Sequence, residues 1–277
     1  MLKQRVITAL VLLAVLLPAL MVDSPWPFIS FVALAMTAAG WEWARLNGLA
    51  GAAAMGFGAL VLLLLALGIT SFSQPSWLWN LALVIWVLGG ALALRGASPA
   101  WLLVPQAVRL TLGALALVTA GLAFVHWKAQ GLNALLSILC LVWVADIAAY
   151  FGGRRFGRRK LAPAISPGKS WEGVWSGWLG VFLLALGWVH FVDPWLGGSS
   201  LFGQLVTAKG WPLALLVCLV LSVLSVVGDL FESLVKRAVG AKDSSQLLPG
   251  HGGVLDRVDA LLPTLPAALA LSQGLLP

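Results

Sequence analysis

Long apolar runs separated by short polar turns make up most of this 277-residue chain. A helix needs about 20 mostly apolar residues to cross the hydrocarbon layer of a membrane. Nine stretches have this pattern, so the sequence predicts an all-α, polytopic integral membrane protein with about nine transmembrane helices. The predicted spans are residues 6–22, 27–45, 52–71, 77–94, 107–126, 133–151, 171–192, 210–229 and 254–275.

Two of these segments have a second interpretation. The first apolar run follows Lys3 and Arg5, as in a signal peptide, although no small-x-small cleavage site comes after it. The last run begins with charged residues and contains Pro263 and Pro266. It therefore either spans the membrane or re-enters it from one side.

The basic residues test this map, because Lys and Arg in short loops accumulate on the cytoplasmic side of a membrane. With the N-terminus in the cytoplasm, all 17 Lys and Arg except Lys128 and Lys209 fall on the cytoplasmic side. This asymmetry supports both the spans and their orientation. We expect an integral membrane protein with its N-terminus and its long polar loops facing the cytoplasm.

The composition agrees with a membrane protein. The chain is 61% hydrophobic and only 10% charged, whereas a soluble domain has roughly 25% charged residues. The net charge of +7 is concentrated beside membrane segments, where it can meet anionic lipid headgroups or a phosphate-rich substrate. Membrane lipids are therefore the expected partners, and nucleic acid is not.

Polar residues divide the chain into two parts. Residues 1–132 contain only two acids, Asp23 and Glu42, and are predicted to form structural transmembrane helices without a chemical role. Residues 133–277 contain the other acids and two long polar loops. This second part is the predicted catalytic transmembrane region with cytoplasmic loops.

The first polar block covers residues 146–173. Asp146 lies within a predicted span, where an acid is costly and marks a functional candidate by default; the alternative is that it pairs with a nearby Arg. In SPGKSWEG, a Pro-Gly turn places Lys169 and Ser170 just before a helix, whose exposed N–H groups favour anions. The pattern suggests a phosphate site but lacks the Walker spacing.

The second polar block begins with Asp229 at the end of a predicted span. Helical spacing places Asp229, Glu232 and Lys236 on one face of this helix. Glu232 and Lys236 are four residues apart, and we interpret Glu232 as the partner of Lys236 in an ion pair.

Further acids follow in the sequence GHGGVLDRVD. Asp256 and Asp259 are three residues apart and face the same way if a helix starts nearby. Together with Asp229 they could hold a divalent cation, and hard oxygen ligands suit Mg2+. The alternative is that Asp256 pairs with Arg237 or Arg257.

Three glycines surround His251 in the same stretch. Gly250, Gly252 and Gly253 allow a tight turn whose backbone approaches a ligand closely. His251 could donate to a phosphate or bond the backbone, and the sequence does not decide between these roles.

The run SLVKRAVGAKDSSQLLPGHGGVLDRVD, Ser233 to Asp259, resembles the signature of the CTP:phosphatidate cytidylyltransferases, also called CDP-diacylglycerol synthases. The upstream stretches DIAAYFGGRRFG, SPGKSWEG and GDLFES also resemble this family, so the likeness covers about residues 140–262. Ser245 is a minor departure, since Gly is as frequent there.

The resemblance implies an enzyme that converts CTP and phosphatidate to CDP-diacylglycerol and pyrophosphate with Mg2+, with room for a second cation and for a homodimer. It implies catalytic roles for Asp229, Asp256, Asp259 and Lys242, and places the cation on Asp229, Asp256 and Asp259, with Asp146 further out. The residues implied in substrate binding are Lys169, Ser170, Lys236, Arg237, His251, Gly252, Gly253 and Arg257.

Three alternative functions fit the sequence less well. A CDP-alcohol phosphotransferase would need a DG-x2-AR stretch, which the sequence lacks. A CTP-dependent lipid or polyprenol kinase is closer in type, but the long signature disfavours it. An ion-coupled transporter would place its acids near the middle of the membrane, whereas here they gather at one face.

Overall fold

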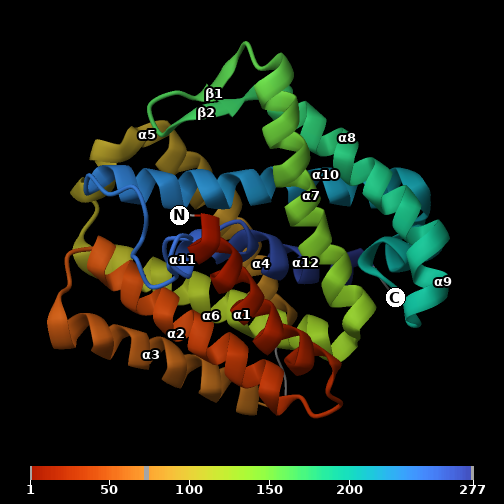
Figure 1. Ribbon diagram of the computed structural model, residues 1–277, viewed down its shortest axis with the longest axis horizontal. Coiled ribbons are helices and arrows are strands. Elements are labelled where there is room, and N and C mark those ends of the chain that lie inside the picture. Colours follow the sequence, from red (N-terminus) through yellow and green to blue (C-terminus); the bar gives the residue numbers. More distant parts are fainter. Residues whose placement is uncertain (1, 72–74, 276–277) are drawn as a thin grey trace.

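The computed structural model describes residues 2–71 and 75–275 and consists almost entirely of helices (Figure 1). The first part contains α1 (Leu2–Met21), α2 (Trp26–Leu46), α3 (Gly51–Thr70), α4 (Ser76–Val84), the π-helical turn η1 (Ile85–Gly89), α5 (Gly90–Leu103) and α6 (Gln106–Gln130). The second part contains α7 (Leu132–Phe156), β1 (Lys160–Ala162), β2 (Ser166–Ser170), α8 (Trp171–Gly187), η2 (Trp188–Val192), α9 (Asp193–Leu196), α10 (Leu201–Ala238), α11 (Leu255–Val258) and α12 (Leu261–Leu275).

Every predicted span is helical, which confirms an all-α integral membrane protein. Within the described residues, seven helical segments are long and apolar enough to cross a membrane: 4–21, 51–70, 106–130, 132–156, 171–196, 201–238 and 255–275. The predicted spans at α2 and at α4 with η1 do not belong to this set of seven. The count of nine spans, the cytoplasmic N-terminus and the homodimer stay predictions.

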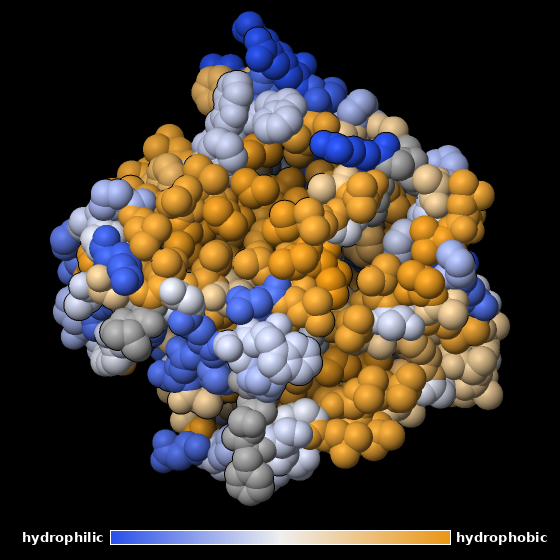
Figure 2. Space-filling view, turned by 180° about the vertical axis from the view of Figure 1, so that it is seen from behind, coloured by the Kyte–Doolittle hydropathy of each residue, from blue (hydrophilic) through white to orange (hydrophobic). Residues whose placement is uncertain are grey.

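Apolar side chains cover much of the surface. Large aliphatic residues of α1 and α3 are exposed, among them Ile7, Leu10 and Leu63. Figure 2 shows one face that is mostly apolar, with hydrophilic residues at the end where Figure 1 places the β1–β2 hairpin and further hydrophilic patches toward the left and lower edges. Such a surface is stable against lipid rather than against water.

The helix that carries the second polar block is longer than predicted. We predicted a span at residues 210–229, and α10 continues to Ala238. It breaks at Gly210, whose φ of 78° and ψ of 170° favour glycine, and Pro212 follows. From the break to Ala238 the helix rises about 40 Å, more than the roughly 30 Å of hydrocarbon. Its polar last turns therefore extend beyond the apolar stretch.

The polar loop between α7 and α8 forms a short antiparallel hairpin. Lys160 of β1 pairs with Ser170 of β2. Ser170 then caps α8, because its buried Oγ accepts a hydrogen bond from the N–H of Gly173 at 3.2 Å. Glu172 in the first turn of α8 accepts hydrogen bonds from the N–H groups of Arg158 and Arg159, both at 3.1 Å. In the turn predicted to bind phosphate, the hydroxyl oxygen of Ser170 is thus already bonded to the N–H of Gly173 within the protein.

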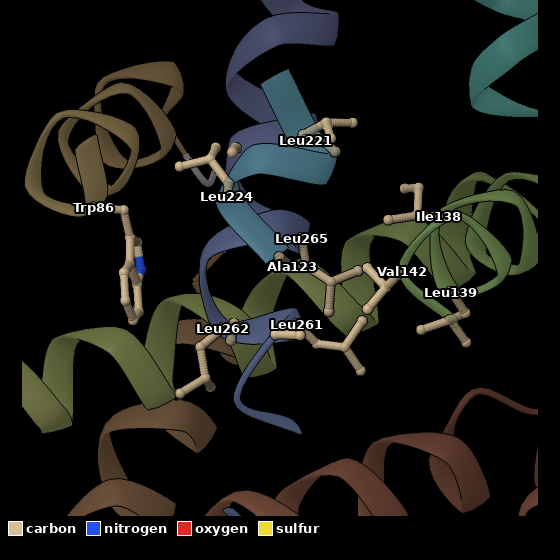
Figure 3. Packing of buried hydrophobic residues seen from close by; sticks show 14 of the residues in the cluster. Trp86, Ala123, Ile138, Leu139, Val142, Leu221, Leu224, Leu261, Leu262 and Leu265 are labelled. Carbon is tan, nitrogen blue, oxygen red and sulfur yellow. The ribbon is translucent and has the colours of Figure 1, made fainter. Parts of the chain in front are cut away.

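The last helix lies inside the bundle. α12 contacts α4, α6, α7 and α10, and of the seven apolar segments the one that contains it has the largest buried share, 67%. Leu261, Leu262 and Leu265 pack among side chains of these neighbours (Figure 3). Protein therefore surrounds the prolines of this segment, a setting in which helix-breaking residues are tolerated within a membrane.

Candidate active site

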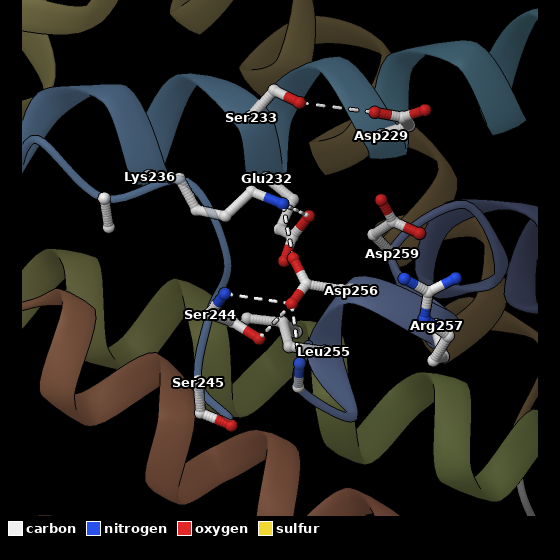
Figure 4. A network of polar contacts seen from close by, with 12 residues as sticks. Asp229, Glu232, Ser233, Lys236, Ser244, Ser245, Leu255, Asp256, Arg257 and Asp259 are labelled. Carbon is white, nitrogen blue, oxygen red and sulfur yellow. Dashed lines mark hydrogen bonds and ion pairs between the residues drawn. The ribbon is translucent and has the colours of Figure 1, made fainter. Parts of the chain in front are cut away.

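Lys236 lies at the centre of a buried cluster of charges (Figure 4). Its Nζ is 2.6 Å from Oε2 of Glu232, one turn earlier on α10, and 2.5 Å from Oδ1 of Asp256 on α11. The first contact confirms the ion pair predicted from the spacing. The second shows that Asp256 pairs with Lys236, so the alternative partners Arg237 and Arg257 are wrong.

Asp256 has partners on both carboxylate oxygens. Its Oδ2 accepts hydrogen bonds from the N–H of Ser244 at 2.9 Å, the hydroxyl of Ser244 at 2.9 Å and the N–H of Gly253 at 2.7 Å. Hydrogen bonds to an ionised acceptor are among the strong ones in proteins. Asp256 therefore connects the ammonium of Lys236 to the loop that precedes α11.

Glycine is required next to this carboxylate. Gly252 has a φ of 83°, and a Cβ there would lie 2.7 Å from Oδ2 of Asp256. A Cβ on Gly253 would overlap the hydroxyl of Ser244. The turn predicted from the glycines exists, and its backbone packs against Asp256.

A second lysine joins the hairpin to α10. Nζ of Lys169 is 2.7 Å from Oδ2 of Asp229, and both side chains are partly exposed. Asp146 on α7 interacts electrostatically with Lys169 and with Asp229. The lysine of the first polar block and Asp229 therefore meet here, and none of the three ion pairs among the described residues joins Asp146 to an Arg.

Asp259 lies between these two groups (Figure 4). Its Oδ1 accepts a hydrogen bond from the N–H of Ala260 at 2.8 Å, and its carboxylate interacts electrostatically with Asp229 and with Glu232. The Oε1 atom of Glu232 is buried without a hydrogen-bond partner. The site thus contains more carboxylates than ammonium groups, and at least one carboxylate oxygen accepts no hydrogen bond from the described residues.

The carboxylates do not form a complete metal cage. Among the described residues, no group of three His, Cys, Asp or Glu side chains is arranged to hold a metal ion. Mg2+ seldom uses such a cage, because it keeps several waters and binds through one or two carboxylates together with substrate phosphates. The acid excess and the unpartnered Oε1 of Glu232 fit a cation of this kind.

The remaining predicted residues lie around this centre. Lys242 is exposed on the wall of an open polar cleft that also contains Arg45. Arg237 donates to the carbonyl of Ala241 at 2.9 Å, and Arg257 donates to the carbonyl of His251 at 2.6 Å. These arginines thus brace the loop by its carbonyls.

The side chain of His251 has a buried nitrogen that no other group of the described residues bonds. Its backbone N–H donates to the carbonyl of Leu248 at 2.8 Å, which closes the glycine turn. Its Nδ1 atom is buried and has no hydrogen-bond partner.

Comparison with known proteins decides the family. The sequence model of the cytidylyltransferase family matches residues 3–274. The chain belongs to the cytidylyltransferase family.

Relatives in this family are similar over nearly the whole chain. A phosphatidate cytidylyltransferase of Pseudomonas aeruginosa is 40% identical over 278 residues, which covers 98% of this chain and 97% of that protein. One of Haemophilus influenzae is 36% identical over 293 residues, with 96% of each chain covered. One of Brucella suis is 46% identical over 133 residues, 48% of this chain and 44% of that protein.

One part of this cluster comes from the half predicted to be structural. Glu42 on α2 is fully buried and contacts the loop that holds Asp256. Sequence reasoning missed it, as it missed Ser244. A signal was available, since an acid inside an apolar segment is a functional candidate by default, the argument that we applied only to Asp146.

Proposed function

We propose that the chain transfers the cytidylyl group of CTP to phosphatidate and releases CDP-diacylglycerol and pyrophosphate. The observation that carries this proposal is the 40% identity over almost the entire length to a relative named phosphatidate cytidylyltransferase. The buried cluster of lysines and carboxylates supports it, because it has the charges that such a reaction needs. We place the protein in a bacterial inner membrane with this cluster open to the cytoplasm, as the distribution of Lys and Arg predicts.

The chemistry needs no nucleophile from the protein. A phosphate oxygen of phosphatidate attacks the α-phosphorus of CTP, a new P–O bond forms, and the bond to pyrophosphate breaks. Both reactants are anions, so the protein has to bring them together and neutralise charge in the in-line transition state. Lys169 and Lys236 are held in place by carboxylates for this task.

The cationic residues at the rim complete the binding surface. Lys242 is exposed and free to reach a triphosphate. Arg237 and Arg257 are also exposed, and each uses one nitrogen on a loop carbonyl. A guanidinium has five N–H donors, so each arginine has further donors for phosphate oxygens.

We further propose that the acids of this cluster hold Mg2+. Asp229 and Asp259 are the favoured ligands, because among the described residues Oδ2 of Asp259 has no donor and Oδ1 of Asp229 has only the hydroxyl of Ser233, at 3.3 Å. Asp256 lies next to them but has Lys236 and three loop donors as partners, and Asp146 is the group for a second cation. When bound, the cation supplies positive charge to the reacting phosphates and orients them.

A direct assay tests this function. Purified protein in detergent is given Mg2+, CTP labelled in its cytosine and phosphatidate, and we expect label in a lipid-soluble product together with released pyrophosphate. Diacylglycerol in place of phosphatidate is the control that distinguishes a lipid kinase. The proposal would be overturned if no labelled lipid forms with either CTP or dCTP.

A further inference from the structure

A single carboxylate of the N-terminal half binds three donors of the C-terminal half and contacts a fourth group. Glu42 on α2 is fully buried. Its Oε1 accepts hydrogen bonds from the hydroxyl of Ser245 at 2.5 Å and the N–H of Val254 at 3.0 Å. Its Oε2 accepts from the N–H of Leu255 at 2.7 Å and lies 3.2 Å from the hydroxyl oxygen of Ser244, whose one proton is shared with the nearer Asp256. All four groups belong to the loop between α10 and α11 or to its end.

This arrangement is specific for a carboxylate. Burying a charge without partners is very costly, and no Lys or Arg pairs with Glu42 among the ion pairs of the described residues. Hydrogen bonds supply the compensation instead, and two of them come from backbone N–H groups that can only donate. Gly253 makes room, since a Cβ there would lie 2.7 Å from the carboxyl carbon of Glu42.

The same loop holds Asp256. The hydroxyl of Ser244 lies between two carboxylates, 3.2 Å from Glu42 and 2.9 Å from Asp256. Asp256 in turn lies 2.5 Å from the ammonium of Lys236. Glu42 is therefore connected to the ammonium of Lys236 through one serine and one aspartate.

We propose that Glu42 is a positioning residue for cytidylyl transfer. It fixes the loop of residues 244–255 against α2, and the fixed loop sets the direction of Asp256 and, through it, of the Lys236 ammonium. This inference rests on the proposed function. It also gives the N-terminal half a part in the reaction without contact to either substrate.

The test is the substitution Glu42→Gln, which keeps the size of the side chain but turns one acceptor into an NH2 group. That group faces donors, and the N–H of Val254 or Leu255 cannot accept from it. We expect kcat to fall by roughly 10- to 100-fold, because displacements of about 1 Å have such effects, while the KM values for CTP and phosphatidate change by less than about threefold. Glu42→Asp keeps the charge and should recover part of the lost kcat.

Two further variants separate positioning from folding. Thr37→Val on the same helix removes a hydroxyl that bonds only the carbonyl of Ala33, and it should leave kcat unchanged. Ser245→Ala removes one donor of Glu42 without removing the charge, and it should lower kcat by a smaller factor even if Glu42→Gln does not fold. Hydrogen exchange should show faster exchange at the amides of Val254 and Leu255 in Glu42→Gln, with α2 unchanged.

The outcomes are distinguishable. A wild-type enzyme without cytidylyl transfer overturns the proposed function. An active wild type with full kcat in folded Glu42→Gln, or in Ser245→Ala where Glu42→Gln does not fold, overturns only the role of Glu42. Lower kcat with unchanged KM values, partial recovery in Glu42→Asp and faster exchange at the two amides support it.

Discussion

At the scale of single residues, the site depends on charges that are buried in pairs. Lys236 is compensated by Glu232 and Asp256 at contact distance. Removing one partner of a buried pair is strongly destabilising, by about 3–5 kcal/mol, because the other charge stays buried. The acids and lysines of this site therefore contribute to the stability of the fold in addition to the role in the reaction that we propose for them.

Asp256→Asn should reduce turnover by about 100-fold or more, since misdirected catalytic groups have effects of this size. The amide keeps one oxygen but presents an NH2 group either to Lys236 or to the donors of Ser244 and Gly253. Turnover at saturating CTP and phosphatidate is the measurement. Asp23→Asn is the control, because Asp23 is exposed and distant from Asp256 in the sequence, and it should behave as wild type. A normal rate in Asp256→Asn would refute the catalytic role of Asp256.

Gly253→Ala should lower the melting temperature and the activity together. Its Cβ would overlap the hydroxyl of Ser244 and press against Glu42, and such overpacking costs about 1–3 kcal/mol. Gly274→Ala is the matched control, because nothing lies within 4 Å of a Cβ there. Equal melting temperatures for the two variants in detergent would show that the loop does not need this close approach.

At the scale of elements, α10 is the structure on which the site depends. It carries Asp229, Glu232 and Lys236 on one face, beyond a break at Gly210. The break lets the chain before it run in a different direction from the helix after it. The helix after the break can then extend past the apolar layer and present its polar turns to α11 and the hairpin.

Gly210→Ala should destabilise the protein by about 1–3 kcal/mol, because a backbone conformation with φ of 78° and ψ of 170° is strained for any residue with a Cβ. Thermal unfolding in detergent is the measurement, and kcat of the folded enzyme should stay normal. Gly187→Ala is the control, at a glycine with helical φ and ψ and an open surrounding. If both variants unfold at the same temperature, the backbone conformation at position 210 does not require glycine.

Local sequence patterns predicted which helices exist better than they predicted where those helices end. Apolar runs located every membrane helix, and the i,i+4 spacing of Glu232 and Lys236 predicted their ion pair, because both signals depend only on neighbouring residues. The predicted span ended at residue 229 because the last turns of α10 are polar, although the helical spacing used for the ion pair already reached Lys236. The hairpin of residues 160–170 was missed because three- and five-residue strands leave little pattern.

At the scale of the whole molecule, the site joins parts that are distant in the sequence. Lys169 is in β2, Asp229 is on α10, Asp259 follows α11 and Glu42 is on α2. The family resemblance brought the first three together before the structure did. It could not include Glu42, because its motifs begin near residue 140. An acid in an apolar segment marked Glu42 as a candidate, but a contact across some 200 residues gives no local signal of its partners.

If Glu42 positions the loop as we propose, residues 1–132 contribute to the site as well as to the membrane bundle. Residues 1–132 supply the carboxylate that holds the loop of the active site, and α1 adds to this contact, since Arg5 and Thr8 donate to the carbonyls of Gly250 and Pro249 at 3.0 and 2.9 Å. The division into 1–132 and 133–277 stays a description of where the polar residues lie. The active site itself is held from both sides.

The most direct test of the central claim measures turnover of wild type and Asp229→Asn with CTP and phosphatidate across a titration of Mg2+. The account predicts that a chelator abolishes wild-type activity and that added Mg2+ restores it. Asp229→Asn should be at least about 100-fold slower and should need more Mg2+, with Asp23→Asn as the control. Asp229→Asn that works at the wild-type rate at limiting Mg2+ would contradict the account.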